Sequence, residues 1–391
     1  MAPHCKARAG AVREILFVAG ESSGDAHAAG VARELIAARA PYKLVGIGGD
    51  QMQAAGVDLI EHTRRLAVMG FVEVLETIPR HWALLQTLKR RLREGNVAAV
   101  VLIDYPDFNM IVASAATEIG VPVLYYITPQ VWAWRPGRLD KLAKTVTKAA
   151  VILPFEEKLL RDHGIDATFV GHPLLDRAAA IPDRASARTS LGLGPDDRVL
   201  ALFPGSRKQE VERHLDDFIA VARELERRMA GLKVVVAVAP HVTIDAAKCP
   251  YPMVRSASFT VLRAADAAFC KSGTTTLEAA VAGCPLVVAY RMNALNYAVA
   301  RWLVKVPNIG LVNLIAGRRL VPEFVQDELQ PQRVADALAP LLERGSRERR
   351  EMVDGLDAVR AALGSPGASG RVATLVTTLA ERGEREKTRG R

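Results

Sequence analysis

The stretch RVLALFPGSRKQEV, residues 198–211, is typical of a strand that turns directly into a helix. An apolar run ends at Pro204 and Gly205, and Ser206 and Arg207 stand where the helix is expected to begin. Such a corner presents free backbone N–H groups and the positive end of a helix dipole, and a guanidinium beside it favours a phosphate or carboxylate. A tight turn whose Arg207 pairs with a nearby acid is the alternative that these residues leave open.

The same alternation of strand-like and helical stretches continues on both sides of this corner. Apolar runs occur at EILFVAG, KLVGIGG, NVAAVVLID and PVLYYIT before it, and at LKVVVAVAP, ADAAFCKSG and PLVVAYR after it. Near-continuous apolar strands separated by helices are the signature of parallel sheets covered on both faces. We therefore predict an α/β fold with two doubly wound, Rossmann-like parallel-sheet domains facing across a cleft.

The length of the chain agrees with two domains, because 391 residues exceed the roughly 100 to 200 residues of one domain. A polar break over residues 176–197 suggests the boundary. We predict an N-terminal domain over residues 1–180, a C-terminal domain over residues 181–365, and a terminal helix with a charged tail over residues 366–391.

The formal net charge of +9 favours acidic partners, which could be nucleic acid, an anionic membrane surface or phosphorylated substrates. The four cysteines form no Cys-x-x-Cys pair and the eight histidines no His-Glu-x-x-His pattern, so structural zinc and a disulfide framework are not expected. No apolar run approaches the roughly 18 residues of a membrane-spanning helix. These features predict a cytoplasmic protein, either soluble or peripheral to a membrane.

A second corner of the same kind lies in ADAAFCKSGTTTLEAAVAGCP, residues 265–285. The strand is expected to end near Lys271, and the hydroxyls and free N–H groups that follow can take a second anionic oxygen. Two such corners could hold a diphosphate between them. Glu278 lies about one helical turn further on, where a carboxylate can reach ribose hydroxyls. The alternatives are a simple helix cap at Thr274 and an exposed helix position at Glu278.

Two strand ends in the first half also carry polar residues. The loop AGESSGD, residues 19–25, lacks a Walker lysine and a Gly-x-Gly-x-x-Gly pattern, but Glu21 and Ser23 could meet a sugar or phosphate. VVLIDYPDFN, residues 100–109, ends a strand on Asp104, which is a candidate general base. Asp107 is expected to cap the helix that begins near Asn109. The Asp-x-x-Asp spacing is not the Asp-x-Asp of a divalent-metal glycosyl transfer site.

Residues 66–95 combine apolar and basic side chains in one amphipathic segment. Met69, Phe71 and Val72 next to a basic stretch suit an anionic membrane surface, and core packing is the alternative. The aromatic segment YYITPQVWAWRPGR, residues 125–138, could line an acceptor site or fill the core.

The chain resembles the lipid-A-disaccharide synthase family from about residue 15 to about residue 342. The resemblance rests on the ordered motifs AGESSGD, LAVMGFVEVL, IDYPDFN, TPQVWAWRPGR, GHPLLD, LFPGSRKQEVE, SGTTTLEA, VAYRMN and LVNLIAGR. It implies an inverting GT-B type glycosyltransferase of Gram-negative bacteria. This enzyme would join UDP-2,3-diacylglucosamine to 2,3-diacylglucosamine 1-phosphate, giving the β-1,6-linked lipid A disaccharide 1-phosphate and UDP. Ser22 and Lys271 are small departures from the motifs, which concern fine donor contacts and not the reaction.

The resemblance also implies roles for domains and residues. The first domain would meet the acceptor and the cytoplasmic face of the inner membrane through Met69, Phe71 and Val72, and the second would bind the UDP-sugar. No metal, other cofactor or nucleic acid is implied, and a homodimer is left open. Asp104 would be the general base. Glu21, Ser23 and Asn313 would be further cleft residues, and the donor site would comprise Ser206, Arg207, Ser272, Gly273, Thr274, Thr275 and Glu278.

Two other functions compete with this one. A UDP-N-acetylglucosamine 2-epimerase could use a related two-domain scaffold, but it would need no lipid surface. A non-catalytic module that binds sugar nucleotide at a membrane would not need Asp104 at a strand end. Incubation of a UDP-sugar alone would separate the epimerase from the transferase, and release of UDP in the presence of acceptor would separate the binding module from it.

Overall fold

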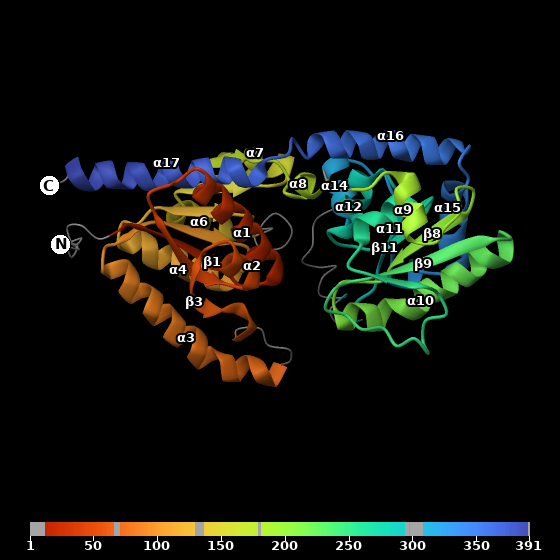
Figure 1. Ribbon diagram of the computed structural model, residues 1–391, viewed down its shortest axis with the longest axis horizontal. Helices are drawn as coiled ribbons and strands as arrows, with labels where there is room; N and C mark the ends of the chain where they lie inside the picture. Colours follow the sequence, from red (N-terminus) through yellow and green to blue (C-terminus); the bar gives the residue numbers. More distant parts are fainter. Residues whose placement is uncertain are drawn as a thin grey trace. The chain divides into compact units, whose positions relative to one another are not determined.

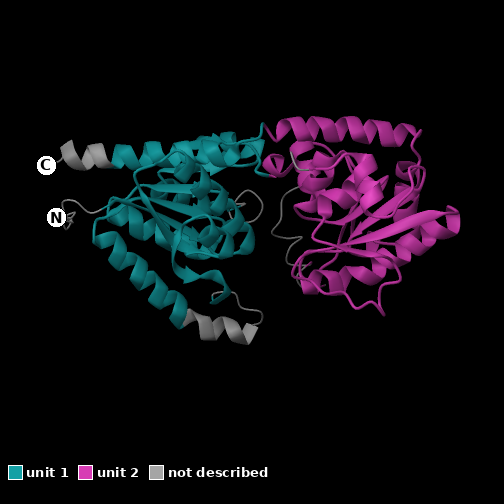
Figure 2. Cartoon of the chain, in the orientation of Figure 1, with its two compact units in different colours: residues 1–173, 365–391 teal, residues 174–364 magenta. Residues whose placement is uncertain are grey.

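The computed structural model describes residues 12–65, 71–129, 137–178, 181–293, 297 and 308–389, with only the backbone described for residues 71–78 and 384–389. The chain divides into two compact units (Figure 2). Unit 1 comprises Met1–Pro173 and Ser365–Arg391, and unit 2 comprises Leu174–Gly364. The expected boundaries were 180/181 and 365/366, and the terminal segment that we expected to stand apart belongs to unit 1.

Unit 1 is built on a seven-stranded sheet in the order β3-β2-β1-β4-β5-β6-β7. Every pair of neighbouring strands is parallel. The strands are β1 (Glu14–Ala19), β2 (Lys43–Gly48), β3 (Asp58–His62), β4 (Val97–Ile103), β5 (Val123–Tyr126), β6 (Lys148–Val151) and β7 (Ala167–Phe169). The chain starts in the middle of the sheet and winds outward first on one side and then on the other, which is the doubly wound pattern.

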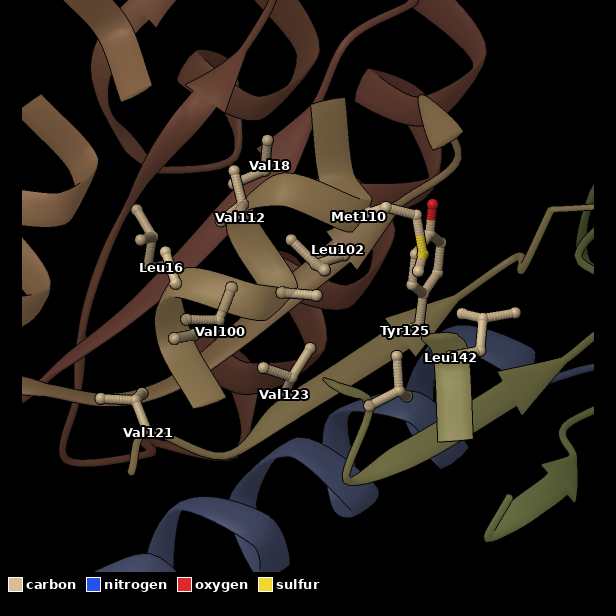
Figure 3. Packing of buried hydrophobic residues seen from close by; sticks show 14 of the residues in the cluster. Leu16, Val18, Val100, Leu102, Met110, Val112, Val121, Val123, Tyr125 and Leu142 are labelled. Carbon is tan, nitrogen blue, oxygen red and sulfur yellow. The ribbon is translucent and has the colours of Figure 1, made fainter. Parts of the chain in front are cut away.

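Helices cover both faces of this sheet (Figure 1). Because side chains alternate along a strand, Leu16 and Val18 pack with one hydrophobic cluster (Figure 3), and Ile15 and Phe17 pack with the other. The first cluster includes residues of α3 (Phe71–Arg93), α4 (Pro106–Glu118), α6 (Gly137–Thr145) and α7 (Pro154–Asp162). The second includes residues of α1 (Ser22–Ala37), α2 (Asp50–Ala54) and α17 (Ala368–Arg389).

The last helix, α17, returns the chain to unit 1 and packs beside α1. Val372 and Val376 are fully buried in the same cluster as the apolar residues of α1. Arg371 fastens the start of the helix, because its guanidinium donates to the carbonyl oxygens of Val170 (2.8 Å), Pro366 (2.9 Å) and Ser365 (2.5 Å). One face of the sheet is therefore completed by a segment far away in the sequence.

Unit 2 repeats the architecture with a six-stranded parallel sheet in the order β10-β9-β8-β11-β12-β13. Its strands are β8 (Arg198–Phe203), β9 (Leu232–Val238), β10 (Met253–Arg255), β11 (Ala267–Lys271), β12 (Leu286–Tyr290) and β13 (Glu323–Val325). Its helices include α8 (Leu174–Ala178), α9 (Arg184–Ser190), α10 (Lys208–Arg228), α11 (Ser258–Ala264), α12 (Thr275–Ala282), α14 (Leu311–Ala316), α15 (Pro331–Leu342) and α16 (Arg347–Ala362). The predicted pair of doubly wound parallel sheets is confirmed.

A buried carboxylate organises the amino end of β11 in unit 2. Asp266, which is fully buried, accepts hydrogen bonds from Arg184 (2.6 Å), Arg188 (2.9 Å) and the Val199 N–H (2.9 Å). Arg344 adds a further contact at 3.3 Å. These bonds join α9, β8 and the end of α15 on the side of the sheet away from the candidate site, so they stabilise the unit without contributing to chemistry.

Candidate active site

The order of the strands reverses between β1 and β4 in unit 1, and between β8 and β11 in unit 2. In open parallel sheets ligands bind beyond the carboxyl ends of the strands at such switch points, because the loops there diverge to opposite faces. The residues that follow β1, β4, β8 and β11 are therefore the ones to inspect. They include both corners predicted in unit 2 and both polar strand ends predicted in unit 1.

The first corner of unit 2 has the predicted form, with β8 ending at Phe203 and α10 beginning at Lys208. Gly205 has φ +151°, and a Cβ there would lie 2.6 Å from Glu210 Cβ, so a side chain at this position would be strained. Ser206 and Arg207 are exposed, and Arg207 occupies the N-cap position without capping through its side chain. An acidic residue of α10, Glu210, also belongs to this corner. Its Oε2 accepts the Ser206 N–H at 2.9 Å and lies 3.3 Å from Ser206 Oγ.

The second corner lies directly beside the first, since β8 and β11 are neighbours. Lys271 Nζ donates to Glu210 Oε1 at 2.8 Å, so the Glu210 carboxylate touches both corners. Burial by itself raises the pKa of the Glu210 carboxyl, but the hydrogen bonds from Lys271 and the Ser206 N–H outweigh it and lower that pKa. A carboxylate held in this way shows that the corner accommodates negative charge.

Ser272, Gly273, Thr274 and Thr275 form the turn into α12. Ser272 Oγ donates to the Ile309 carbonyl (2.9 Å), and Thr276 Oγ1 donates to the Gly273 carbonyl (2.9 Å). Thr274 is at the N-cap position, but its side chain makes no capping hydrogen bond. The simple cap considered as the alternative is therefore absent at Thr274, and its exposed hydroxyl remains at the carboxyl end of the sheet.

Glu278 is buried, so an exposed helix position is wrong for it. Its carboxylate accepts from Arg177 Nη1 of α8 at 3.2 Å, and the Arg177 guanidinium also lies 5.2 Å from the centre of the Phe259 ring. Arg177 is a residue that sequence reasoning missed. The ion pair with Arg177 therefore fixes the Glu278 carboxylate in the first turn of α12, which begins directly after the predicted phosphate corner.

Asn313 has a structural role, in contrast to the cleft role expected for it. The side chain is fully buried, and its amide donates to Val321 O (2.9 Å) and Glu323 Oε1 (2.7 Å) while accepting from the Val321 N–H (2.8 Å). Glu323 in turn accepts from the N–H groups of Ile309 and Gly310, both at 2.9 Å. Asn313 and Glu323 therefore shape the loop that also receives Ser272.

In unit 1, Asp104 follows β4 directly, as predicted. Asp104 and Tyr105 both adopt the left-handed conformation, with φ of 49° and 50°. Non-glycine residues pay strain energy there, and such residues cluster at functional sites. Two side chains hold the turn by donating to the Asp104 carbonyl, Tyr125 Oη at 2.8 Å and Asn109 Nδ2 at 2.6 Å. The Asp104 side chain is half-buried at the switch point.

Tyr105 connects this turn to two other segments. Its ring covers Gly20, where a Cβ would lie 2.2 to 2.4 Å from ring atoms, so the loop after β1 requires glycine at this position. Tyr105 Oη and His81 Nε2 of α3 share a hydrogen bond of 2.6 Å. Burial, and then the Glu21 carboxylate, raise the pKa of the Tyr105 hydroxyl, which keeps it protonated. The sequence showed no sign of this Gly20–Tyr105–His81 contact.

Asp107 does not cap a helix, which corrects the prediction made from sequence. Helix α4 begins at Pro106, so Asp107 lies inside its first turn, and its exposed carboxylate pairs with Arg138. The N-cap position belongs to Tyr105, which makes no side-chain capping bond. The error arose because a Pro at the first helical position moves the start of the helix toward the N-terminus.

Glu21 and Ser23 lie at the start of α1, where both are exposed, and Glu21 occupies the N-cap position without a side-chain capping bond. Asp25, one turn later, is buried and accepts the N–H groups of Gly49 (2.7 Å), Gln51 (3.0 Å) and Met52 (3.0 Å). It anchors the loop after β2 to the loop after β1. Among the described residues, no group of three or more His, Cys, Asp and Glu side chains could hold a metal ion.

The amphipathic segment forms helix α3. Met69 lies outside the described residues, and for Phe71 and Val72 only the backbone is described. Further along, Leu84, Leu88 and Leu92 are buried in the core while Trp82 is 64% exposed. Within the described residues no helix has an apolar stretch long enough to cross a bilayer. Tyr125 and Tyr126 of the aromatic segment fill the core, and residues 130–136 lie outside the described part.

Comparison with solved structures defines the class of protein. The calicheamicin glycosyltransferase CalG4 is 17% identical with a TM-score of 0.62, covering 95% of this chain and 98% of that one. The UDP-N-acetylglucosamine 2-epimerase from Neisseria meningitidis, solved with UDP-GlcNAc, is 11% identical with a TM-score of 0.60, covering 94% of this chain and all of that one. At such identities the likeness shows the fold alone, which is the GT-B fold of two parallel-sheet domains.

Sequence relatives identify the family within that class. A profile described as lipid-A-disaccharide synthetase matches residues 15–367. The lipid-A-disaccharide synthase of Syntrophus aciditrophicus is 40% identical over 95% of this chain and 98% of its own length. That of Anaeromyxobacter sp. strain K is 42% identical over 93% of this chain and 96% of its own. The chain belongs to the lipid-A-disaccharide synthase family and is a glycosyltransferase of lipid A biosynthesis.

Proposed function

We propose that the chain transfers 2,3-diacylglucosamine from its UDP carrier to the 6-hydroxyl of 2,3-diacylglucosamine 1-phosphate. The products are the β-1,6-linked disaccharide 1-phosphate and UDP. Beyond family membership, one observation supports this reaction most directly. In unit 2 a guanidinium, an ammonium and the start of α12 gather at the carboxyl ends of β8 and β11. Positive charge at a switch point suits a nucleoside diphosphate.

On the donor side, Arg207, Ser206 and the turn at residues 272–275 contact the diphosphate. The bond between the anomeric carbon and the phosphate oxygen breaks, and the electron pair leaves with UDP. A guanidinium can span two phosphate oxygens, and the helix start adds backbone N–H donors, so both stabilise the leaving charge. Because these groups supply the positive charge, the proposed mechanism needs no divalent ion. Glu278, held by Arg177, faces the ribose end of the nucleotide in this proposal.

On the acceptor side, Asp104 is the general base. The 6-hydroxyl oxygen attacks the anomeric carbon from the side opposite the leaving diphosphate, which inverts the configuration. Its proton passes to the Asp104 carboxylate as the bond forms. The two hydrogen bonds on the Asp104 carbonyl keep the strained turn in place, so the carboxylate needs no rearrangement before reaction. Glu21 and Ser23, on the neighbouring loop, are candidate contacts for the acceptor sugar.

Both substrates carry fatty acyl chains, so the proposed site of action is the cytoplasmic face of the inner membrane. We propose that Met69, Phe71 and Val72, at the start of α3 and the segment before it, insert among the acyl chains. The exposed basic residues toward the end of α3, Arg90 and Arg93, would meet anionic headgroups, whereas Arg91 pairs with Glu14. Nucleic acid has no part in this proposal, and the state of assembly, monomer or homodimer, does not affect it.

The decisive assay incubates purified protein with radiolabelled UDP-diacylglucosamine, with and without diacylglucosamine 1-phosphate, in the presence of EDTA. We expect a labelled disaccharide and an equal amount of UDP only when both substrates are present. Conversion of the UDP-sugar alone to an isomer would identify an epimerase. Binding of the UDP-sugar without turnover in the complete mixture would identify a binding module. Activity that returns only with added magnesium or manganese would contradict metal independence.

A further inference from the structure

Lys271 supplies the ammonium at the donor corner, and the proposed mechanism gives it no specific contact with the substrate. It is the last residue of β11 and directly precedes the Ser272 turn. Its side chain is 15% exposed, and its Nζ lies 2.8 Å from Glu210 Oε1 and 5.5 Å from the centre of the Tyr290 ring. A Cβ on Gly273 would come within 3.9 Å of the same nitrogen. The ammonium therefore lies inside the second corner and not on the outer surface.

The ammonium has unused hydrogen-bonding capacity. A lysine carries three N–H donors. In the part of the chain that the structure describes, Glu210 accepts the only hydrogen bond from Lys271 Nζ. The ammonium also makes an electrostatic contact with the face of the Tyr290 ring, but the ring face offers no lone pair that could accept a conventional hydrogen bond. Lys271 can therefore donate to a second anionic oxygen without giving up Glu210.

Glu210 shows how close the two corners are to one another. One carboxylate receives the Ser206 N–H through one oxygen and Lys271 Nζ through the other. The backbone of Glu210 is also held in place. The Arg291 N–H donates to His214 Nε2 (2.9 Å), which leaves His214 Nδ1 to donate to the backbone carbonyl of Glu210 (2.7 Å). The Ser206 N–H and the Lys271 ammonium are thus within reach of one small anionic group.

From this arrangement we infer that Lys271 is a second cation of the donor site, which binds the diphosphate of the UDP-sugar together with Arg207. Glu210 is the positioning residue that holds Lys271 between the two corners. The inference rests on the proposed function, since it takes a nucleoside diphosphate as the ligand.

The position of Lys271 predicts an effect on turnover as well as on binding. Breaking the glycosidic phosphate bond adds negative charge to the leaving diphosphate, so a cation at this point stabilises the transition state more than the bound substrate. Loss of the ammonium should lower kcat by more than it raises KM for the donor. Replacing a residue with a purely structural role would not lower kcat by more than it raises KM for the donor.

The test measures binding of uridine, UMP and UDP by calorimetry to the full chain and to Lys271→Met. The charged hydrogen bond that is lost corresponds to about a 10-fold weaker affinity for UDP. Uridine affinity should not change, and UMP affinity should fall no more than UDP affinity does. Lys271→Arg, which keeps the charge, should recover part of the UDP affinity. Lys233→Met, an exposed position on β9, is the matched control and should bind all three ligands like the unmodified chain.

Glu210→Gln separates a direct contact from an effect transmitted through Glu210. If Lys271 contacts the diphosphate, Glu210→Gln should lower UDP affinity by less than Lys271→Met does, because the ammonium remains and the glutamine amide oxygen can still accept from it. Equal loss of uridine and UDP affinity in Lys271→Met, or no loss at all, would overturn the inference while leaving the proposed function intact. Failure of the unmodified chain to bind UDP would instead count against the proposed function, and the inference would fall with it.

Discussion

Asp104 is held in a strained turn at the end of β4, with its carbonyl fixed by Tyr125 and Asn109. Asp104→Asn keeps the shape of the side chain but cannot accept a proton. We expect kcat to fall by about two to four orders of magnitude, which is the usual contribution of a general base. UDP affinity should be unchanged, because the proposed donor contacts belong to unit 2. Single-turnover kinetics together with calorimetry with UDP would measure both quantities.

Asp107→Asn is the matched control for this variant, since it makes the same chemical change in the same loop. Its carboxylate is exposed and pairs with Arg138 at the surface, where ion pairs contribute little. Turnover should be mostly retained. If Asp107→Asn loses turnover and Asp104→Asn does not, the base is Asp107; if neither does, the proton leaves by a different route.

Gly20 tests whether Tyr105 keeps the Asp104 turn in its conformation. A methyl group at Gly20 would collide with the Tyr105 ring, so Gly20→Ala must displace the ring or the loop. We expect kcat to fall by about 100-fold, the scale of an ångström misplacement of a catalytic group, with a folded protein. Gly345→Ala, where a Cβ meets nothing within 4 Å, should retain full activity. Normal turnover of Gly20→Ala would show that the ring contact has no role in positioning Asp104.

At the scale of secondary-structure elements, the Asp266 network joins α9, β8 and β11. Asp266→Ala leaves Arg188, which is 3% exposed, without its carboxylate partner. Removing one member of a buried ion pair should lower the free energy of unfolding by about 3 to 5 kcal/mol. Chemical denaturation followed by circular dichroism would measure the change. Glu351→Ala breaks the exposed Arg347–Glu351 pair of α16 and should leave the denaturation midpoint where it was.

Helix α3 has a core-packed second half and a proposed membrane-binding start. Replacing Met69, Phe71 and Val72 together with serine should weaken binding to anionic vesicles and raise the apparent KM for acylated acceptor. Each apolar side chain withdrawn from lipid forfeits roughly 1.5 to 3 kcal/mol if fully buried, and less if it only touches the surface. Vesicle co-sedimentation and steady-state kinetics measure the two effects.

Leu88→Ala provides the contrast within the same helix. Leu88 is fully buried, so this variant should lose about 2 to 5 kcal/mol of stability while the folded fraction still binds vesicles. If the triple serine variant instead loses its cooperative melting transition, those three residues are part of the core and the membrane proposal is wrong.

At the scale of the whole molecule, unit 1 depends on the last segment of the chain. Deleting residues 365–391 removes Val372 and Val376 from the cluster beside α1, together with the Arg371 hydrogen bonds. We expect hydrogen exchange to increase throughout β1–β7 while β8–β13 keep their protection, since unit 2 has its own core. Equal loss of protection in both sheets would show that the two units unfold as one.

Local sequence patterns predicted the architecture correctly because strands and helices depend on near neighbours in the chain. The strand–corner–helix order at residues 198–211 and the polar ends of β4 and β11 follow from periodicity and from Pro and Gly positions. The same local reasoning misplaced the start of α4 and therefore the role of Asp107. Helix ends are least certain where two signals, here Pro106 and the Asp side chain, indicate different starting points.

By itself, the sequence determined two parallel-sheet α/β domains, membership of the lipid-A-disaccharide synthase family, and the strand ends where chemistry is expected. Tertiary structure alone decided which side chains meet there. Glu210 and Lys271 are 61 positions apart, and Arg177 and Glu278 are 101 apart. The burial of Asn313 and the packing of α17 in unit 1 were likewise visible only in the tertiary structure. The physical reason is that periodicity reports which face of an element is buried, whereas hydrogen bonds between loops depend on the order in which strands assemble in the sheet.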